Sequence, residues 1–184
     1  MENISIDKIV ELDKDKWQGY PLDFRYVTHS YYDVEINRIG DDFNVSFAKK
    51  PFDMPFEKVS EHTDKLFGHW WDDIKAWGIV EGNNLLAAIE TSVEVWNNRL
   101  RVNELWINEK YRHRGIGTAM MDIAVKRARD ENRRAVVLET QSCNEAAITF
   151  YLKYGFTLIG FDSCAYRNND MSRREVRLEL GLFL

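Results

Sequence analysis

The residues best suited to chemistry form a short turn with two glycines, Arg112-His113-Arg114-Gly115-Ile116-Gly117. Because glycine lacks a Cβ, backbone N–H groups at Gly115 and Gly117 can approach an anion closely. A helical pattern starts at Ile116, and the free N–H groups of a helix start add positive potential. Arg112 and Arg114 add charge, although either flexible side chain can equally lie in solvent. The turn predicts a phosphate site.

Several other kinds of site are not supported. The turn lacks the third glycine and the downstream acidic residue of a dinucleotide fingerprint, and it lacks the Gly-Lys-Ser/Thr end of a Walker loop. Neither NAD nor ATP is therefore favoured. Cys143 and Cys164 are the only cysteines and lack metal-ligand spacing, so we expect two small buried thiols, no disulfide and no metal site.

Length and composition indicate one soluble globular domain spanning residues 1–184. The chain is 45% hydrophobic and 30% charged, so it can build a core. The net charge of −5 argues against a nucleic-acid partner and favours a cationic one. We expect no membrane span, because no apolar run approaches about 18 residues. The acidic start of the chain has no basic segment before an apolar stretch, so we expect a cytoplasmic protein.

The elements around the turn follow from changes in hydrophobic period. Strand patterns precede it, a helix from Ile116 to about Ala128 follows it, and that helix is expected to direct Lys126, Arg127 and Arg129 outward. Asn144 can cap a second helix that ends at Gly155. The expected strands cover residues 76–80, 85–95, 100–107, 135–138, 156–161 and 175–180, the last two antiparallel to the strand over residues 135–138.

The first part of the chain gives weaker patterns. Residues 1–30 suggest a loose, aromatic-bearing entry. Alternation over residues 31–47 around Gly40 predicts a β-hairpin, after which Pro51 and Pro55 interrupt the pattern. Residues 60–71 predict an amphipathic helix.

The glycine turn, the preceding strand end Glu104-Leu105-Trp106-Ile107, Asn144, and the run from Phe150 to Phe156 together resemble the GNAT superfamily of acetyl-CoA-dependent N-acetyltransferases. The resemblance covers residues 76–161. Residues 96–102, 138–141 and 155–162, followed by Tyr166, are similar to the streptothricin (nourseothricin) acetyltransferases within that superfamily. The resemblance implies an α/β (α+β) GNAT fold, with a mixed, mostly antiparallel central sheet, splayed to admit acetyl-CoA, and helices on both faces. The coenzyme-binding region would cover about residues 100–161.

For the coenzyme, the resemblance implies three contact regions. The turn and helix start would bind the pyrophosphate of acetyl-CoA, the strand end would offer backbone groups to the pantetheine and thioester, and Asn144 would hold the pantetheine arm. The residues concerned are Arg112, Arg114, Gly115, Ile116, Gly117 and Thr118 in the turn, and Trp106 and Ile107 in the strand.

The resemblance also implies an acid and a base. An amine with a pKa near 10.4 is mostly protonated at pH 7, so its proton has to be removed before attack. Glu104 is the candidate base, although many relatives carry a carboxylate at the position of Asn103, and another carboxylate or a water-mediated route stays open. Tyr151, two helical turns beyond Asn144, is the candidate acid for the departing thiolate. The alternatives are a solvated Glu104 and a core tyrosine.

A cationic acceptor needs carboxylates and flat apolar surface. The candidates are Asp162, then Glu90, Glu94 and Trp96, with Asp64, Asp72, Asp73, Trp70, Trp71 and Tyr166 as further possibilities. Alternation puts Glu90, Ser92 and Glu94 on one strand face, either lining a groove or facing solvent. The expected acceptor is a small streptothricin-like amine, handled by a monomer or homodimer. The alternatives are a GNAT enzyme for another amine and a non-catalytic acyl-CoA-binding module.

Overall fold

The computed structural model describes residues 6–59, 64–69 and 71–184. The chain divides into two compact units. The first unit contains residues 1–24, 61–138 and 182–184, and the second contains residues 25–60 and 139–181.

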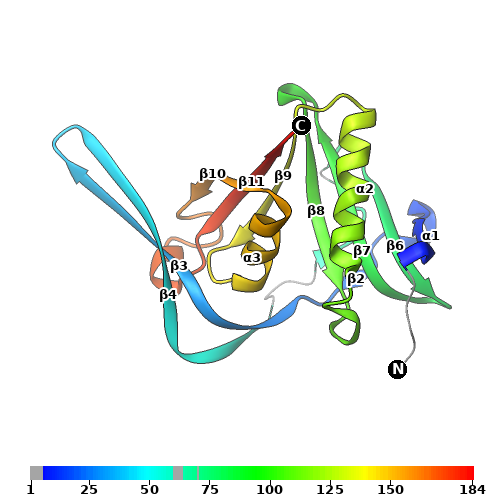
Figure 1. The fold of residues 1–184 in the computed structure, drawn as a ribbon, viewed down its shortest axis with the longest axis horizontal. Helices are drawn as coiled ribbons and strands as arrows, with labels where there is room; N and C mark the ends of the chain where they lie inside the picture. Colours follow the sequence, from blue (N-terminus) through cyan, green and yellow to red (C-terminus); the bar gives the residue numbers. More distant parts are fainter. Residues whose placement is uncertain (1–5, 60–63, 70) are drawn as a thin grey trace. The chain divides into compact units, whose positions relative to one another are not determined.

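One mixed sheet has seven strands in the order β1-β6-β7-β8-β9-β11-β10 (Figure 1). Its strands are β1 (Ile9–Glu11), β6 (Lys75–Glu81), β7 (Asn84–Glu94), β8 (Arg99–Ile107), β9 (Ala135–Gln141), β10 (Thr157–Asp162) and β11 (Arg177–Phe183). The pairs β1–β6, β6–β7, β7–β8 and β10–β11 are antiparallel, whereas β8–β9 is parallel. The predicted mixed, mostly antiparallel sheet is confirmed. Because β10 and β11 are antiparallel to each other, the expectation that both run antiparallel to β9 is wrong for one of them.

The β8–β9 ladder covers only three residue pairs, from Arg99 with Ala135 to Arg101 with Val137. Strand β8 continues to Ile107, so it leaves this ladder after Arg101. This early end of the parallel pairing agrees with the splay expected in the middle of the sheet.

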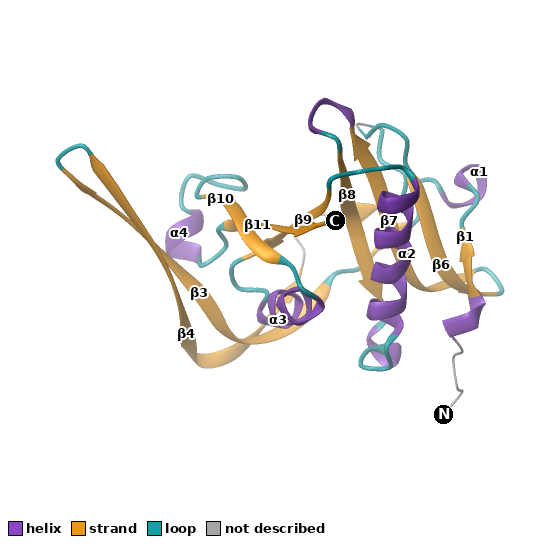
Figure 2. Ribbon diagram, turned by 45° about the horizontal axis from the view of Figure 1, so that its top comes forward, coloured by secondary structure: helices purple, strands orange, loops and turns teal. Residues whose placement is uncertain are grey.

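Helix α2 (Ile116–Asp130) covers one face of β7 and β8 (Figure 2). Its buried side includes Ile116, Met120, Ala124 and Ala128, as the sequence predicts. The expectation that Arg127 faces outward is wrong, since this residue is only 6% exposed.

Arg127 is buried because its guanidinium finds several acceptors beneath the helix. It donates from Nη1 to the carbonyl and Oγ1 of Thr91, and from Nη2 to the carbonyl and Oδ2 of Asp73. Its Nε donates to Glu131, one turn further along the helix. A fully partnered guanidinium can be buried where an unpaired one could not.

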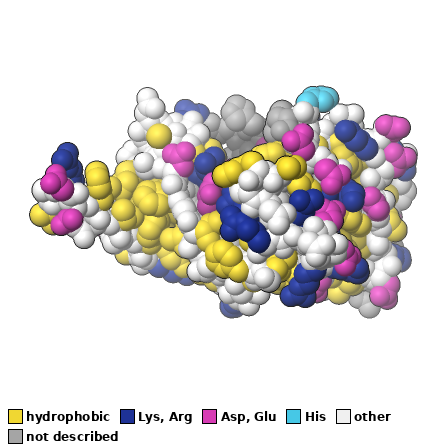
Figure 3. Space-filling model, turned by 90° about the horizontal axis from the view of Figure 1, so that it is seen from above, with side chains coloured by type: hydrophobic (Ala, Val, Ile, Leu, Met, Phe, Trp, Pro, Cys, Tyr) yellow, Lys and Arg dark blue, Asp and Glu magenta, His cyan; other side chains and the backbone are white. Residues whose placement is uncertain are grey.

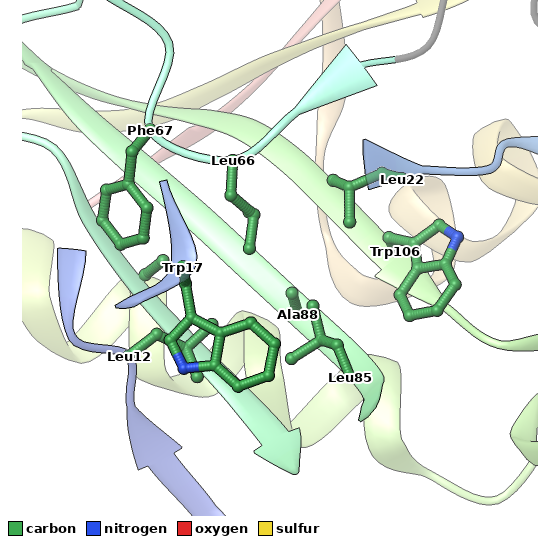
Figure 4. Packing of buried hydrophobic residues seen from close by; sticks show 9 residues of the cluster. Leu12, Trp17, Leu22, Leu66, Phe67, Leu85, Ala88 and Trp106 are labelled. Carbon is green, nitrogen blue, oxygen red and sulfur yellow. The ribbon is translucent and has the colours of Figure 1, made fainter. Parts of the chain in front are cut away.

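The N-terminal segment packs on the face of β7 and β8 that lies opposite α2. This segment contains η1 (Ile6–Lys8), α1 (Lys14–Trp17) and β2 (Pro21–Leu22), and β2 pairs with β5 (Asp64–Lys65). Trp17 and Leu22 pack with Leu66 and Trp106 in one cluster (Figure 4). The sequence expectation of a loose entry is therefore wrong.

The predicted helix over residues 60–71 is also wrong within the described part, because Asp64 and Lys65 form β5 and residues 66–69 are irregular. Residues 60–63 and Trp70, which belong to the same prediction, lie outside the described residues.

The second unit is built on a long hairpin, β3 (Arg25–Ile39) with β4 (Asp42–Val59). The predicted hairpin around Gly40 is confirmed, but β4 continues through Pro51 and Pro55. Val34 packs near α3 (Glu145–Tyr154) in a small core with Ile148, Val176 and Leu178. Phe43, close to the hairpin turn, is exposed. Figure 3 shows hydrophobic side chains at the surface in yellow. The remaining helices are η2 (Val95–Asn97), η3 (Glu109–Tyr111) and α4 (Asp170–Arg173).

Candidate active site

Helix α2 begins directly after the glycine turn, at the protein surface. Gly115 adopts φ +80°, and its carbonyl accepts the first helical hydrogen bond, from Ala119 N at 3.1 Å. The N–H groups of Ile116, Gly117 and Thr118 precede that bond, so the helix itself supplies them with no carbonyl acceptor. Gly115 has no side chain to cap them. This arrangement fits a diphosphate, whose oxygens accept such donors.

Both arginines of the turn are anchored by local contacts. Arg112 Nε donates to the carbonyl of Ile107 at 3.1 Å. Arg114 Nη2 donates to the carbonyl of Lys110, and its guanidinium lies 5.5 Å from the centre of the Tyr111 ring. Arg114 is exposed and Arg112 is half-buried. These anchors keep two positive charges close to the helix start, where an anion would also be attracted by the helix dipole.

Residues of β8 direct their backbone groups alternately toward β7 and toward the opposite edge of the strand, where the Ile107 carbonyl accepts from Arg112. Asn108 N donates to Leu86 O, so Asn108 bonds toward β7. In an antiparallel pair every second residue of a strand bonds the neighbouring strand, and the residues between point their N–H and C=O away from it. Trp106 therefore bonds β7, whereas the N–H and C=O of Ile107 point to the other edge. The Trp106 ring is buried and donates from Nε1 to the carbonyl of Asp23. Of the two predicted backbone contacts, the pairing assigns the open edge to Ile107 and not to Trp106.

Glu90 lies at the centre of a buried polar network. Its side chain accepts from Phe67 N at 2.5 Å and from Asn103 Nδ2 at 3.2 Å. Asn103 Oδ1 in turn accepts from Ser92 Oγ at 2.8 Å. Glu90 is 1% exposed, so of the two alternatives for this strand face the solvent-facing one is wrong at this residue. Burial raises the pKa of Glu90, and the hydrogen bonds from Phe67 and Asn103 oppose that rise.

Glu94 lies on the same strand face but is held by cations. Arg99 and Arg101 donate to its two carboxylate oxygens, each at 2.6 Å, and Asn97 donates at 2.8 Å. Although burial alone would raise it, the pKa of Glu94 is lowered by hydrogen bonds from Asn97, Arg101 and Arg99. The Arg101 guanidinium also lies 5.8 Å from the ring centre of Trp71, another acceptor candidate.

Glu104, the candidate base, lies directly opposite Glu90 in the β7–β8 register. The next pair in the register is Thr91 with Val102, which leaves Asn103 without an opposite residue on β7. Asn103 is therefore the extra residue of a β-bulge. Glu104 is half-buried. Side chains of directly opposed residues lie on one face of a sheet, which brings Glu90 and Glu104 together.

Asn144 and Tyr151 both belong to helix α3 in the second unit. Asn144 is the N-cap, and its Oδ1 accepts from Ala147 N at 3.2 Å, which confirms the predicted cap. Gly155 ends the helix at φ +114°, also as predicted. Tyr151 is 8% exposed, and its ring contacts Phe150 and Phe156. The phenol is thus well packed.

The remaining acceptor candidates lie in different elements, Asp162 at the end of β10 and Trp96 in η2. Asp162 accepts from Cys164 N at 2.9 Å, and this hydrogen bond lowers the pKa of its carboxyl. Arg177 Nη2 lies 3.7 Å from Asp162 Oδ2. Burial raises the pKa of Tyr166. Trp96 is 86% exposed in the turn between β7 and β8.

The two cysteines differ from each other. Both are free thiols, as predicted, and Cys143 is buried beside the Tyr26 hydroxyl. Burial raises the pKa of Cys143. Cys164 is exposed, so the expectation that it is buried is wrong.

Residues 41–156 match the family model described as the acetyltransferase (GNAT) family. The chain belongs to this family. It is an acetyl-CoA-dependent N-acetyltransferase, and the GNAT enzymes that resemble it structurally include proteins solved with coenzyme A or acetyl coenzyme A bound. None of its described helices is long and apolar enough to cross a membrane.

The curated relatives of this GNAT enzyme include two named streptothricin acetyltransferase proteins. The Streptomyces lavendulae enzyme is 28% identical over 152 residues, covering 79% of this chain and 78% of the relative. Streptothricin acetyltransferase A of Bacillus subtilis is 27% identical over 124 residues, covering 67% and 71%.

Solved structures confirm the fold. A nourseothricin acetyltransferase aligns with TM-score 0.73 and 24% identity, covering 96% of this chain and 98% of that one. A putative streptothricin acetyltransferase from Bacillus anthracis, solved with acetyl coenzyme A, aligns with TM-score 0.74 and 22% identity over the same shares.

Sequence reasoning missed the partners of the candidate residues. Phe67 N and Ser92 Oγ complete the Glu90 network, and nothing in their local sequence signals this. Arg127 had one local signal, because Glu131 lies one helical turn further on and pairs with it at 2.8 Å.

Proposed function

We propose that this GNAT enzyme transfers the acetyl group of acetyl-CoA to the β-lysine amine of streptothricin, and so confers resistance to that antibiotic in the cytoplasm. The observation that carries the proposal is the 28% identity to a streptothricin acetyltransferase across 79% of this chain. The net charge of −5 supports a cationic acceptor.

The coenzyme would be held mainly by the start of α2. The N–H groups of Ile116, Gly117 and Thr118 would donate to the diphosphate, and the anchored guanidiniums of Arg112 and Arg114 would neutralise its charge. Asn144 would contact the pantetheine arm. Bound there, acetyl-CoA supplies the thioester that the acceptor amine attacks.

The proton transfers would be divided between two side chains. Glu104 would take the proton that the amine loses as its nitrogen forms the new C–N bond. Tyr151 would give its phenolic proton to the sulfur as the C–S bond breaks. The N–H of Ile107, on the open edge of β8, would donate to the carbonyl oxygen while negative charge develops on it.

For the acceptor, we propose that Asp162 and Trp96 contact the cationic antibiotic. Two points support Asp162: residues 155–162 resemble a segment of the streptothricin acetyltransferases, and a hydrogen bond from Cys164 N lowers the pKa of its carboxyl. Trp96 offers an exposed ring for a cation–π contact. Glu90 and Glu94 are tied to protein groups, so we propose them as supports of the site rather than as direct contacts.

Thiol release from acetyl-CoA in the presence of streptothricin tests this proposal directly. We expect release well above the rate without acceptor, and much faster than with spermidine, an aminoglycoside or an N-terminal peptide. Faster release with one of those amines, or no release with streptothricin, would reject the proposed acceptor.

Tyr151→Phe tests the acid. We expect kcat to fall by about 10-fold or more while KM for acetyl-CoA changes little, because the hydroxyl acts on the leaving group. Tyr154→Phe is a matched control, since Tyr154 lies on the same helix and its ring contacts Phe150 and Phe156 as Tyr151 does. Equal losses in the two variants would contradict the assignment.

A further inference from the structure

The Glu90 carboxylate joins two segments that are far apart in sequence. One oxygen accepts from Phe67 N, 23 residues earlier, and the other accepts from Asn103 Nδ2, 13 residues later. Both bonds are made at a residue that is 1% exposed. Burying a carboxylate costs free energy of folding unless its oxygens keep their hydrogen bonds. The two bonds therefore compensate the burial of Glu90.

The first segment, residues 67–69 and 71–73, contains two strained residues and is held close to each of them. Phe67 has φ +58° and Asp73 has φ +45°, a region that costs a non-glycine residue about 1 kcal/mol or more. Glu90 holds the Phe67 end, and Arg127 holds the Asp73 end through its carbonyl and carboxylate. Val93 N also donates to Asp72 O. Strained backbone of this kind persists only where its surroundings hold it.

The ring of Phe67 shows how firmly this end is seated. It is 3% exposed and packs with Trp17 and Leu66 in the cluster on the face of β7 and β8 opposite α2 (Figure 4). Loss of the bond from Phe67 N to Glu90 would leave a buried donor unpaired in this cluster.

The second segment is the bulge of β8. Asn103 is the extra residue, and its side chain is fixed by Glu90 on one side and Ser92 on the other. A bulge changes the direction of the strand and re-aims the side chains next to it. The neighbour here is Glu104, so the Glu90–Asn103 bond sets the local backbone from which Glu104 projects.

We propose that Glu90 is a positioning residue for acetyl transfer. It holds the Asn103 bulge that aims Glu104, and it holds the Phe67 end of the first segment. The proposal deepens the proposed function, because it rests on Glu104 as the base of the reaction.

The network allows a substitution that separates geometry from charge. In Glu90→Gln the side-chain oxygen can still accept from Phe67 N, and the new amide can donate to Asn103 if Asn103 turns its own amide over. The Asn103 nitrogen would then donate to Ser92 Oγ, which also accepts. Glu90→Gln therefore keeps a hydrogen bond between each pair of partners, whereas Glu90→Ala loses the bonds to Phe67 N and to Asn103.

The matched control is Thr91→Val. Thr91 is the next residue of β7, is equally buried, and bonds Arg127 on the opposite face of the strand. This substitution removes a buried polar group from the same strand and leaves the Glu90 network intact. Arg127 keeps its hydrogen bonds to the Thr91 carbonyl and to Asp73.

Steady-state kinetics with the best amine acceptor of the wild type provide the main test. We expect Glu90→Ala to lower kcat by about 10-fold or more with KM for acetyl-CoA within about two-fold, because the coenzyme turn lies elsewhere. We expect Glu90→Gln to restore kcat to within about three-fold, and Thr91→Val to keep it within about two-fold. An unchanged kcat in Glu90→Ala, or an equal loss in Glu90→Gln or Thr91→Val, would overturn the proposal.

Amide hydrogen exchange provides a readout that needs no acceptor. We expect Phe67 and residues 102–104 to exchange faster in Glu90→Ala than in the wild type and in Glu90→Gln. Unchanged exchange would overturn the positioning role. Full activity of Glu104→Gln would instead reject the proposed base, and failure with streptothricin alone would reject only the proposed acceptor.

Discussion

Glu90 and Glu94 lie four residues apart on the same face of β7, yet their environments are opposite. Glu90 accepts from two neutral donors, Phe67 N and Asn103 Nδ2, and burial raises its pKa. Glu94 meets two arginines, and despite burial the hydrogen bonds from Asn97, Arg101 and Arg99 lower its pKa.

The difference shows that a shared strand face does not define a shared role. Glu94 is an ion-pair centre that ties the β7–β8 turn to β8. Glu90 instead connects a strained segment to a bulge without any cation bonded to it among the contacts of the described residues. The first arrangement stabilises a fold, and the second orients neighbouring groups.

Removing the Glu94 carboxylate should have the largest effect on stability. Glu94→Ala leaves Arg99 and Arg101, whose side chains are 17% and 11% exposed, without their common partner. We expect the free energy of unfolding to fall by about 3 kcal/mol, because a largely buried charge is left uncompensated. Urea denaturation measures this loss, and a change below about 1 kcal/mol would remove the distinction between the two carboxylates.

The pH dependence of stability should separate the two residues by sign. The lowered pKa of Glu94 means that its contribution is present above the ordinary value of 4.5 and is lost as pH falls through the folded-state pKa. The raised pKa of Glu90 gives the reverse, with stability lost as pH rises from 4.5 through its folded-state pKa.

Thermal unfolding between pH 3 and pH 7 would measure both effects. As the pH falls, the stability difference between wild type and Glu94→Gln should shrink. Over the same change, the stability of the wild type should increase relative to that of Glu90→Gln. Parallel curves for the two variants would contradict the assigned pKa directions.

At neutral pH, Glu90→Gln should change the free energy of unfolding by no more than about 1 kcal/mol. The amide can preserve the hydrogen bonds and no longer carries a buried charge. Chemical denaturation of this variant beside Glu94→Gln gives the comparison, and a larger loss in Glu90→Gln would mean that the charge itself stabilises the network.

The smallest effect on stability is expected at Trp96, two residues beyond Glu94. Its ring is 86% exposed, so Trp96→Ala should change stability by less than about 0.5 kcal/mol. If the ring contacts the acceptor, KM for streptothricin should rise a few-fold while KM for acetyl-CoA stays constant. An unchanged KM for both substrates would remove Trp96 from the acceptor site.

The elements around the glycine turn could be predicted because their signals are local. Gly115 and Gly155 occupy the left-handed conformations that glycine favours, and the apolar stripe of α2 repeats at helical spacing. The hairpin around Gly40 was equally visible in its alternation.

The failures occurred where distant contacts override local pattern. The apparent helix over residues 60–71 gives way at Asp64 and Lys65 to a strand paired with Pro21 and Leu22. The apolar residues of the first 30 positions lack a clear period, yet Trp17 and Leu22 are buried because the sheet face they cover needs packing. Their role depends on a surface made by other strands.

The sequence alone determined the glycine turn, the helix behind it and the capped helix α3, because backbone preference and hydrophobic period act between neighbours along the chain. Only the tertiary structure decided that Arg127 is buried on Asp73, 54 residues away, and that Glu90 bonds Phe67, 23 residues away. The state of a buried charge is set by the groups that surround it in space, and spacing along the chain does not specify those groups.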